Sequence, residues 1–122
     1  MDSLTRDRNK EIISTYHLIA NRYDISKMPM RIVIEMVCNS PASRFYMSEG
    51  RAARYIKMAE SGNLRLTGNK RRMFDDFYTV YLRQKERLRG YYKYHVISFC
   101  LHQQAPSFYL SYAQILKIIS EG

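Results

Sequence analysis

The sequence predicts an all-α protein of about six helices, arranged as two packed three-helix units of which the first is helix-turn-helix-like. Apolar residues recur at helical spacing along most of the 122 residues, and only five glycines and three prolines interrupt the pattern. The hydrophobic content of 46% excludes a disordered basic tail. The length indicates one compact domain over residues 1–122, because chains of this size usually fold around a single core.

Two similar segments predict an internal pseudo-repeat of residues 1–62 and 63–122. The run Phe-Tyr-Met-Ser at residues 45–48 recurs 63 positions later as Phe-Tyr-Leu-Ser at residues 108–111. In each copy the serine precedes a stretch with helical periodicity, as an N-cap does. A chance match of four residues is the alternative interpretation.

Three helices are expected in the first half of the chain. The first covers about residues 6–23, where apolar side chains form one stripe. The second covers about residues 29–38 and opens on a proline, although the apolar run from Ile32 to Ile34 could instead be a strand. The third begins after the N-cap Ser48 and ends at the Ser-Gly pair of residues 61–62.

Three more helices are expected in the second half. The fourth covers about residues 69–89 and stops at Gly90, and the fifth covers about residues 91–102. The sixth begins at Ser111 and continues to the end of the sequence. Ser111 and Gln114 have the spacing of a capping box, in which each side chain binds the backbone N–H of the other residue.

The formal charge of +9 is concentrated between residues 41 and 95. This stretch holds 13 basic and five acidic residues, whereas residues 1–40 have a net charge of +1 and residues 96–122 are neutral. Such a concentration of positive charge indicates a surface that binds a polyanion, because solubility alone does not require the charges to be clustered. We therefore expect a nucleic-acid partner, with DNA favoured over RNA.

The third helix is expected to expose a basic face that contains no acid. On a helical projection its alanines and Ile56 lie on the buried side, and Arg51, Arg54 and Lys57 lie on the other. These are the requirements of a recognition helix in the DNA major groove, where arginine can bind guanine and lysine can contact phosphate. A surface helix with ordinary solubilising charge is the alternative.

Lys70, Arg71 and Arg72 open the fourth helix, where cations oppose the helix dipole. A bound phosphate would relieve this conflict, so we expect these three residues to clamp phosphates, with Arg44 as a further contact. Asp76 follows Arg72 by four positions and is expected to neutralise part of the helix. A solvated outer face is the alternative for the rest of this helix.

The chain contains eleven tyrosines, and three of them form the run Tyr-Tyr-Lys-Tyr at residues 91–94. Beside Arg87 and Arg89, these rings could stack on nucleic-acid bases. Tyrosines at helical spacing more often line the edge of a core, with the hydroxyl group reaching water. We expect the core position here.

Neither a catalytic nor a metal site is predicted. The five glycines form no phosphate-binding loop, and Cys100 and His102 are too sparse for zinc. Cys38 and Cys100, in apolar surroundings, indicate buried free thiols in a cytoplasmic protein, and a disulfide between them is the alternative. No apolar run approaches the roughly 18 residues of a membrane span. We expect a non-enzymatic protein with no cofactor and no membrane partner.

Both copies of the repeated segment carry a family resemblance. Pro-Ala-Ser-Arg-Phe-Tyr-Met-Ser and Ala-Pro-Ser-Phe-Tyr-Leu-Ser resemble segments of small, basic, uncharacterised helical proteins from Bacteroides-type bacteria and their mobile elements. No activity is established for that group, so the resemblance implies no site residues.

The alternative function is a protein–protein interaction module. It would act as a homodimer or as an adaptor of a phage or mobile-element system, through the nearly uncharged C-terminal third and exposed tyrosines. An RNA-binding protein is a third possibility, which the sequence does not separate from a DNA-binding one.

Overall fold

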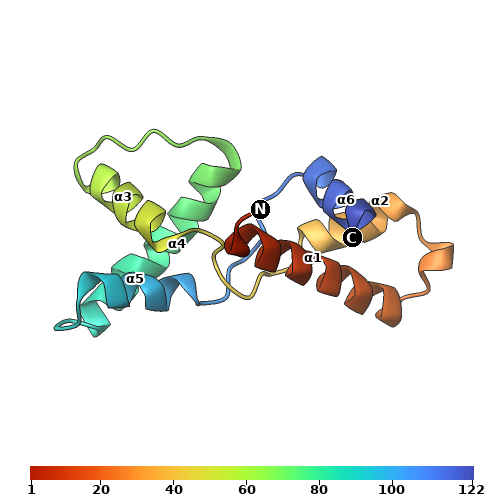
Figure 1. Ribbon diagram of the computed structural model, residues 1–122, viewed down its shortest axis with the longest axis horizontal. Coiled ribbons are helices and arrows are strands. Elements are labelled where there is room, and N and C mark those ends of the chain that lie inside the picture. The colour runs from red at the N-terminus through yellow and green to blue at the C-terminus, as the bar shows by residue number, and fades with distance from the viewer. The chain divides into compact units, whose positions relative to one another are not determined.

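The computed structural model describes residues 1–122, except the side chain of Ile25. The described backbone forms six α-helices, one short 3-10 helix and no strand, so the all-α prediction is confirmed (Figure 1). In chain order the elements are α1 (Ser3–Arg22), η1 (Ile25–Lys27), α2 (Met30–Cys38), α3 (Glu49–Glu60), α4 (Gly68–Arg87), α5 (Lys93–Leu101) and α6 (Tyr112–Glu121).

Helix caps lie where the sequence predicts them. The Ser48 hydroxyl accepts a hydrogen bond from the Arg51 N–H at 3.1 Å and so caps α3. At α6 the Ser111 hydroxyl accepts from the Gln114 N–H, and the Gln114 side chain accepts from the Ser111 N–H, which completes the capping box. The run from Ile32 to Ile34 lies inside α2, so the choice between helix and strand is resolved as helix.

The helices form two compact units of three helices each. The terminal unit (Met1–Ala42 and Pro106–Gly122) contains α1, α2 and α6, and the central unit (Ser43–Ala105) contains α3, α4 and α5. The sequence predicts that the first three helices pack together, but the structure groups α3 with α4 and α5. The caps and apolar stripes of α3 and α6 are alike, so local patterns do not specify the partners of either helix.

Two pairs of helices from the two halves of the chain have equal lengths. α2 and α5 each have nine residues and begin 63 positions apart, and α1 and α4 each have 20 residues. The pseudo-repeat of residues 1–62 and 63–122 stays a prediction. A single compact domain over residues 1–122 likewise stays a prediction, because each unit is described by itself.

Aromatic rings build the core of the central unit. Phe77 is fully buried, and its ring meets that of Phe45 edge to face, with centroids 5.9 Å apart. Phe74 is also buried and makes an edge contact with Tyr55 of α3. Rings of α4 thus hold both α3 and the loop that precedes it.

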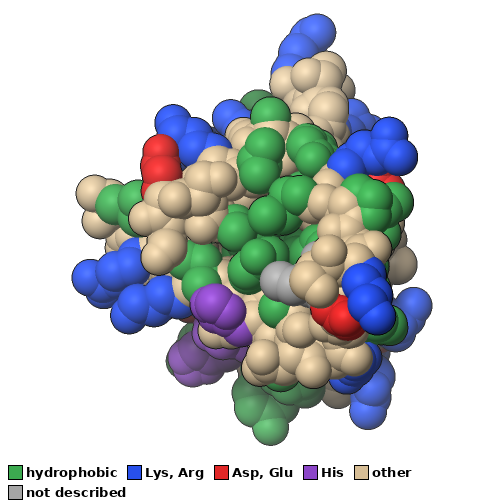
Figure 2. All heavy atoms as spheres, turned by 90° about the vertical axis from the view of Figure 1, so that its right-hand side faces the viewer, with side chains coloured by type: hydrophobic (Ala, Val, Ile, Leu, Met, Phe, Trp, Pro, Cys, Tyr) green, Lys and Arg blue, Asp and Glu red, His purple; other side chains and the backbone are tan. Residues whose placement is uncertain are grey.

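The core of the terminal unit is mostly aliphatic, although Phe108 and Tyr109 are also buried. Ile12 of α1, Ile34 of α2 and Ile115 of α6 are fully buried. Leu18 and Met30 are instead 66% and 50% exposed. Figure 2 shows apolar side chains gathered on the face of this unit that it presents, with Lys and Arg side chains around them.

Candidate nucleic-acid interface

The basic face of α3 is exposed as the sequence predicts. Ala52 and Ile56 are fully buried on the inner side, where α3 packs against α4 and α5. Arg51, Arg54 and Lys57 are exposed on the outer side. Successive side chains are three residues apart, so they span about 9 Å along the helix axis at about 1.5 Å per residue. The three cations therefore form one line on the surface.

Few interactions within the protein occupy these cations. Within the described part of the chain, no ion pair involves Arg51, Arg54 or Lys57. The guanidinium carbon of Arg54 lies 5.6 Å from the centroid of the Tyr55 ring, a cation–π contact on the surface. Glu60, at the end of α3, pairs with a lysine of another helix. The line of cations is thus available to an anionic partner.

The cations at the start of α4 are only partly available. Lys70 and Arg72 are exposed, but Arg72 donates to the side chain of Asn69 at 3.0 Å. Arg71 Nε lies 2.9 Å from Asp75 Oδ1, an ion pair one residue earlier than the predicted pair of Arg72 with Asp76. Of the three predicted clamps, Lys70 is the best placed for phosphate.

The backbone at the start of α4 also favours an anion. The N-cap Thr67 makes no side-chain capping bond, and the first turn contains no acidic residue. The first N–H groups of the helix are thus left without the usual capping acceptor. Together with Lys70, they give this helix end a positive potential.

Arg44 stabilises its own loop. Its Nε donates to the Phe45 carbonyl at 3.1 Å, and its Nη2 donates to the Met47 carbonyl at 3.4 Å. Its Nη1 lies 3.3 Å from His102 Nε2, and the side chain is half-buried. These bonds hold the segment that leads into α3, so Arg44 is the least available of the predicted contacts.

The structure exposes a group of tyrosines that the sequence analysis assigned to a core edge. Tyr91, Tyr92 and Tyr94 are 66%, 80% and 59% exposed, so that expectation is wrong for all three. Tyr91 and Tyr92 lie in the connection between α4 and α5, where helical spacing does not apply, and Tyr94 lies in the first turn of α5. Gly90, with φ of +100°, was the signal that the chain turns away from the helix here.

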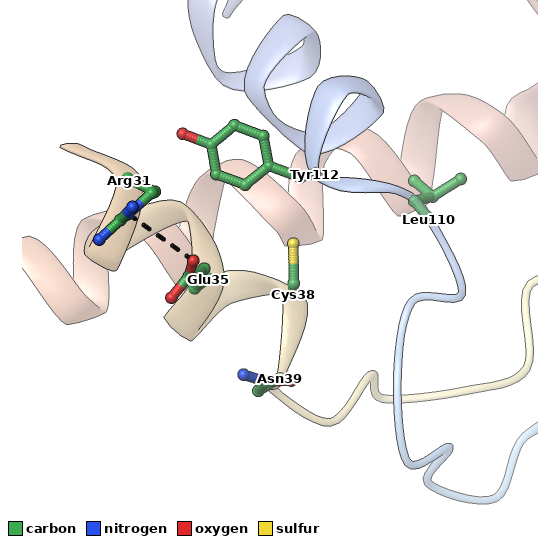
Figure 3. Close-up of a pocket in the computed structure, with 6 residues that line it drawn as sticks. All are labelled: Arg31, Glu35, Cys38, Asn39, Leu110 and Tyr112. Atoms are coloured by element: carbon green, nitrogen blue, oxygen red, sulfur yellow. Dashed lines mark ion pairs between the residues drawn. The ribbon is translucent and has the colours of Figure 1, made fainter.

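A shallow cavity in the terminal unit has a different character. Its volume is about 530 Å³, and Figure 3 shows its lining side chains, which come from α2, α6 and the residues beside them. The lining residues are Arg31, Glu35, Cys38, Asn39, Leu110 and Tyr112. Arg31 and Glu35 form an ion pair across 3.9 Å. The cavity therefore has balanced charge and offers no site for a polyanion.

Both cysteines are free, as the sequence predicts, although only Cys100 is fully buried. Burial raises the pKa of the Cys100 thiol to about 11. Burial also raises the pKa of Cys38, which is half-buried. In the described part of the chain, no group of three His, Cys, Asp or Glu residues could hold a metal ion. No described helix is long and apolar enough to cross a lipid bilayer.

Comparisons with family models, with curated proteins and with solved structures found no match. We therefore infer a function from the charges and the exposed side chains.

Proposed function

We propose that this protein binds duplex DNA through its central unit, with α3 as the helix that enters the major groove. The main support for this proposal is the unequal division of charge between the two units. The central unit has 13 basic and five acidic residues, a net charge of +8, whereas the terminal unit has seven and six, a net charge of +1. A polyanion would be attracted to the central unit alone.

The packing of α3 supports its role in the groove. Contacts with α4 and α5 hold the helix from its inner side, while its basic side is exposed. The major groove is about 12 Å wide and admits one helix. In this arrangement Arg51 and Arg54 bind base edges and Lys57 contacts phosphate, since arginine can form two hydrogen bonds to guanine.

The start of α4 supplies the flanking phosphate contacts. Lys70 and Arg72 are exposed there, beside backbone N–H groups that no side chain caps. Arg71 contributes less because it also pairs with Asp75, and Arg44 contributes least because it binds its own loop. Such contacts fix position on the duplex, whereas α3 supplies any sequence preference.

DNA is favoured over structured RNA because of groove shape. The major groove of A-form RNA is deep and narrow, so side chains on a helix do not reach its base edges. Binding of a DNA duplex should therefore exceed binding of an RNA duplex of equal length and charge. Equal affinity for the two would contradict groove entry by α3.

The direct experiment measures binding to duplex DNA as a function of salt. Roughly five phosphate contacts predict a log–log slope of about −4 to −5. Replacing Arg51, Arg54 and Lys57 together by glutamine should flatten the slope by about 1, because only Lys57 contacts phosphate, and should weaken binding by about 100-fold or more, because two base contacts are also lost. No binding at about 50 mM salt would contradict the proposal, since non-specific contacts are strong there.

A matched control separates the site from total charge. Arg6, Lys10 and Arg22 are exposed cations of α1 in the terminal unit, and their replacement by glutamine removes the same three charges. This control should bind DNA within about twofold of the wild type, because all the proposed contacts lie in the central unit. Equal losses in the two triple variants would contradict a site on α3.

The terminal unit supports a second candidate function, a protein–protein contact. Leu18 of α1 and Met30 of α2 are exposed on it. Figure 2 shows hydrophobic side chains gathered on one face of this unit, as on many interaction surfaces. If this face binds a second copy of the chain, light scattering should show a mass that rises with concentration. Replacing Leu18 and Met30 by lysine should restore the monomer, and a wild type that is monomeric throughout would contradict self-association.

A further inference from the structure

The connection between α4 and α5 exposes aromatic rings together. We call Tyr91, Tyr92 and Tyr94 the aromatic corner; each is more than half exposed. Tyrosine rings normally bury most of their area, so three exposed rings within four residues are an unusual surface. The ring of Tyr92 meets the His95 ring edge to face, with centroids 5.7 Å apart. The contact with His95 therefore supports the Tyr92 ring, which is still 80% exposed.

Cations surround the aromatic corner. A hollow of about 270 Å³ lies beside it within the central unit. This volume is smaller than the roughly 300–1,000 Å³ usual for pockets that bind drug-sized ligands. The hollow is lined by Tyr81, Lys85, Leu88, Arg89, Gly90, Tyr91, Lys93 and Val96. Lys85, Arg89 and Lys93 bring three positive charges to this small concave surface. It has room for a small planar group and attracts anions.

The nearby acids neutralise only part of this charge. Glu86 pairs with Arg89, and Glu60 pairs with Lys93. In the described part of the chain, Lys85 and Arg87 make no ion pair, and both are exposed. The corner therefore combines open π-faces with a residual positive charge. An uncharged apolar partner would make no use of these cations.

We propose that the aromatic corner binds unpaired nucleotides of a single-stranded nucleic acid, with bases stacked on the tyrosine rings and phosphates held by the surrounding cations. Stacking needs a free base face, which an intact duplex does not offer along its length. This inference rests on the proposed function, because it assumes that the central unit binds nucleic acid. The inference extends the proposed function to a more specific substrate class, a duplex with a single-stranded extension.

The test compares three labelled DNA probes by fluorescence anisotropy. They are a single strand of about 12 thymidines, a blunt duplex, and the same duplex with a single-stranded extension of about 12 nucleotides, within the range of known single-strand sites. Replacing Tyr91, Tyr92 and Tyr94 by alanine should weaken single-strand binding about 10-fold or more and leave the blunt duplex unchanged. Phenylalanine at the same positions keeps the rings and should keep the binding.

A matched control uses exposed tyrosines elsewhere. Tyr23 and Tyr112 are 44% and 38% exposed in the terminal unit, and their replacement by alanine should not affect any probe. Because the rings of the corner are exposed, circular dichroism should show all variants folded. Ultraviolet crosslinking to the single strand should label the tryptic peptide of residues 90–93, which contains two rings of the corner.

The outcomes separate this inference from the proposed function. Blunt-duplex binding without single-strand binding overturns the inference alone, and the reverse result overturns duplex binding alone. Equal losses on both probes, or no loss in the alanine variant, overturn stacking at the corner. A wild-type dimer that the alanine variant abolishes also overturns it, since the rings would then be an interface between two copies.

Discussion

The Nζ atom of Lys93 lies 3.5 Å from Oε1 of Glu60, so an ion pair joins the start of α5 to the end of α3. Four other ion pairs among the described residues each join positions three or four apart along the chain. The Lys93–Glu60 pair links the helix that carries the basic face to the helix that follows the aromatic corner. It also neutralises the acid at the end of α3.

Breaking this ion pair should affect stability only slightly. Both side chains are about half exposed, and exposed pairs contribute about 0–1 kcal/mol, which salt screens further. A double-mutant cycle with Glu60→Gln and Lys93→Gln, measured by urea unfolding, should give a coupling energy in that range that vanishes near about 1 M salt. A coupling above about 2 kcal/mol would contradict this view of the pair as a surface contact.

The Phe77→Ala substitution should destabilise the central unit strongly. The side chain is fully buried, and its ring contacts Phe45, Phe74 and Tyr81. Loss of a buried phenylalanine costs about 3–5 kcal/mol because it removes apolar burial and leaves a cavity. Phe99→Ala is the control, since Phe99 is 45% exposed and should cost less than about 1.5 kcal/mol in urea unfolding. Similar losses for both would contradict the core as described.

The two serine caps should contribute alike to stability. Ser48→Ala removes the hydroxyl that accepts from the Arg51 N–H, and Ser111→Ala removes its counterpart at α6. Each loss should cost about 1 kcal/mol, measured as the free energy of unfolding. Gln114→Ala should cost less than Ser111→Ala, because the Gln114 side chain satisfies one N–H at the edge of the helix. If neither serine substitution changed the free energy of unfolding, the assignment of these two caps would be contradicted.

Two glycine-to-alanine substitutions should have opposite effects. Gly90 has φ of +100°, and Gly50 lies in the first turn of α3; a Cβ atom would meet no atom within 4 Å at either position. Gly90→Ala should destabilise by about 1 kcal/mol because of backbone strain alone. Gly50→Ala should stabilise by about 0.5–1 kcal/mol because alanine favours the helix. Thermal unfolding checks both signs, and a stabilising Gly90→Ala would contradict the turn geometry.

Stability should fall at alkaline pH partly because of Cys100. Its thiol has an ordinary pKa of 9.0 in the unfolded chain, and burial raises that pKa to about 11 in the folded protein. The folded state thus binds more protons between these values, so this contribution is complete below pH 9 and is lost as pH rises towards 11. Cys100→Ala should show a smaller alkaline loss in urea unfolding. An identical pH profile would contradict burial of the thiol.

The same burial predicts unequal reactivity of the two thiols. Cys38 is half-buried and Cys100 is fully buried, and the thiolate is the reactive form. Iodoacetamide should therefore modify Cys38 faster in the folded protein, whereas urea should equalise the two rates. Mass spectrometry of the tryptic peptides measures both sites. Faster labelling of Cys100 in the folded state would contradict its position in the core.

The helices, and the face that α3 buries, could be predicted from the sequence alone. Periodicity placed Ala52 and Ile56 inside and Arg51, Arg54 and Lys57 outside, as the structure confirms. Caps such as Ser48 and Ser111 could also be predicted from the sequence, because a cap forms its hydrogen bonds within four residues of its own position. These features depend on local geometry, which a single sequence specifies.

The sequence did not predict which helices pack together or which tyrosines are exposed, and both emerge from the three-dimensional fold. α3 and α6 carry similar caps and apolar stripes, so by sequence pattern each could pack with α1 and α2 or with α4 and α5. The structure groups α3 with α4 and α5. Tyr91 and Tyr92 lie in a connection outside any helical period, so their exposure depends on how the chain turns at Gly90. The physical reason is the same in both cases. Helical periodicity reports which face a segment buries, but it does not report which distant segment covers that face.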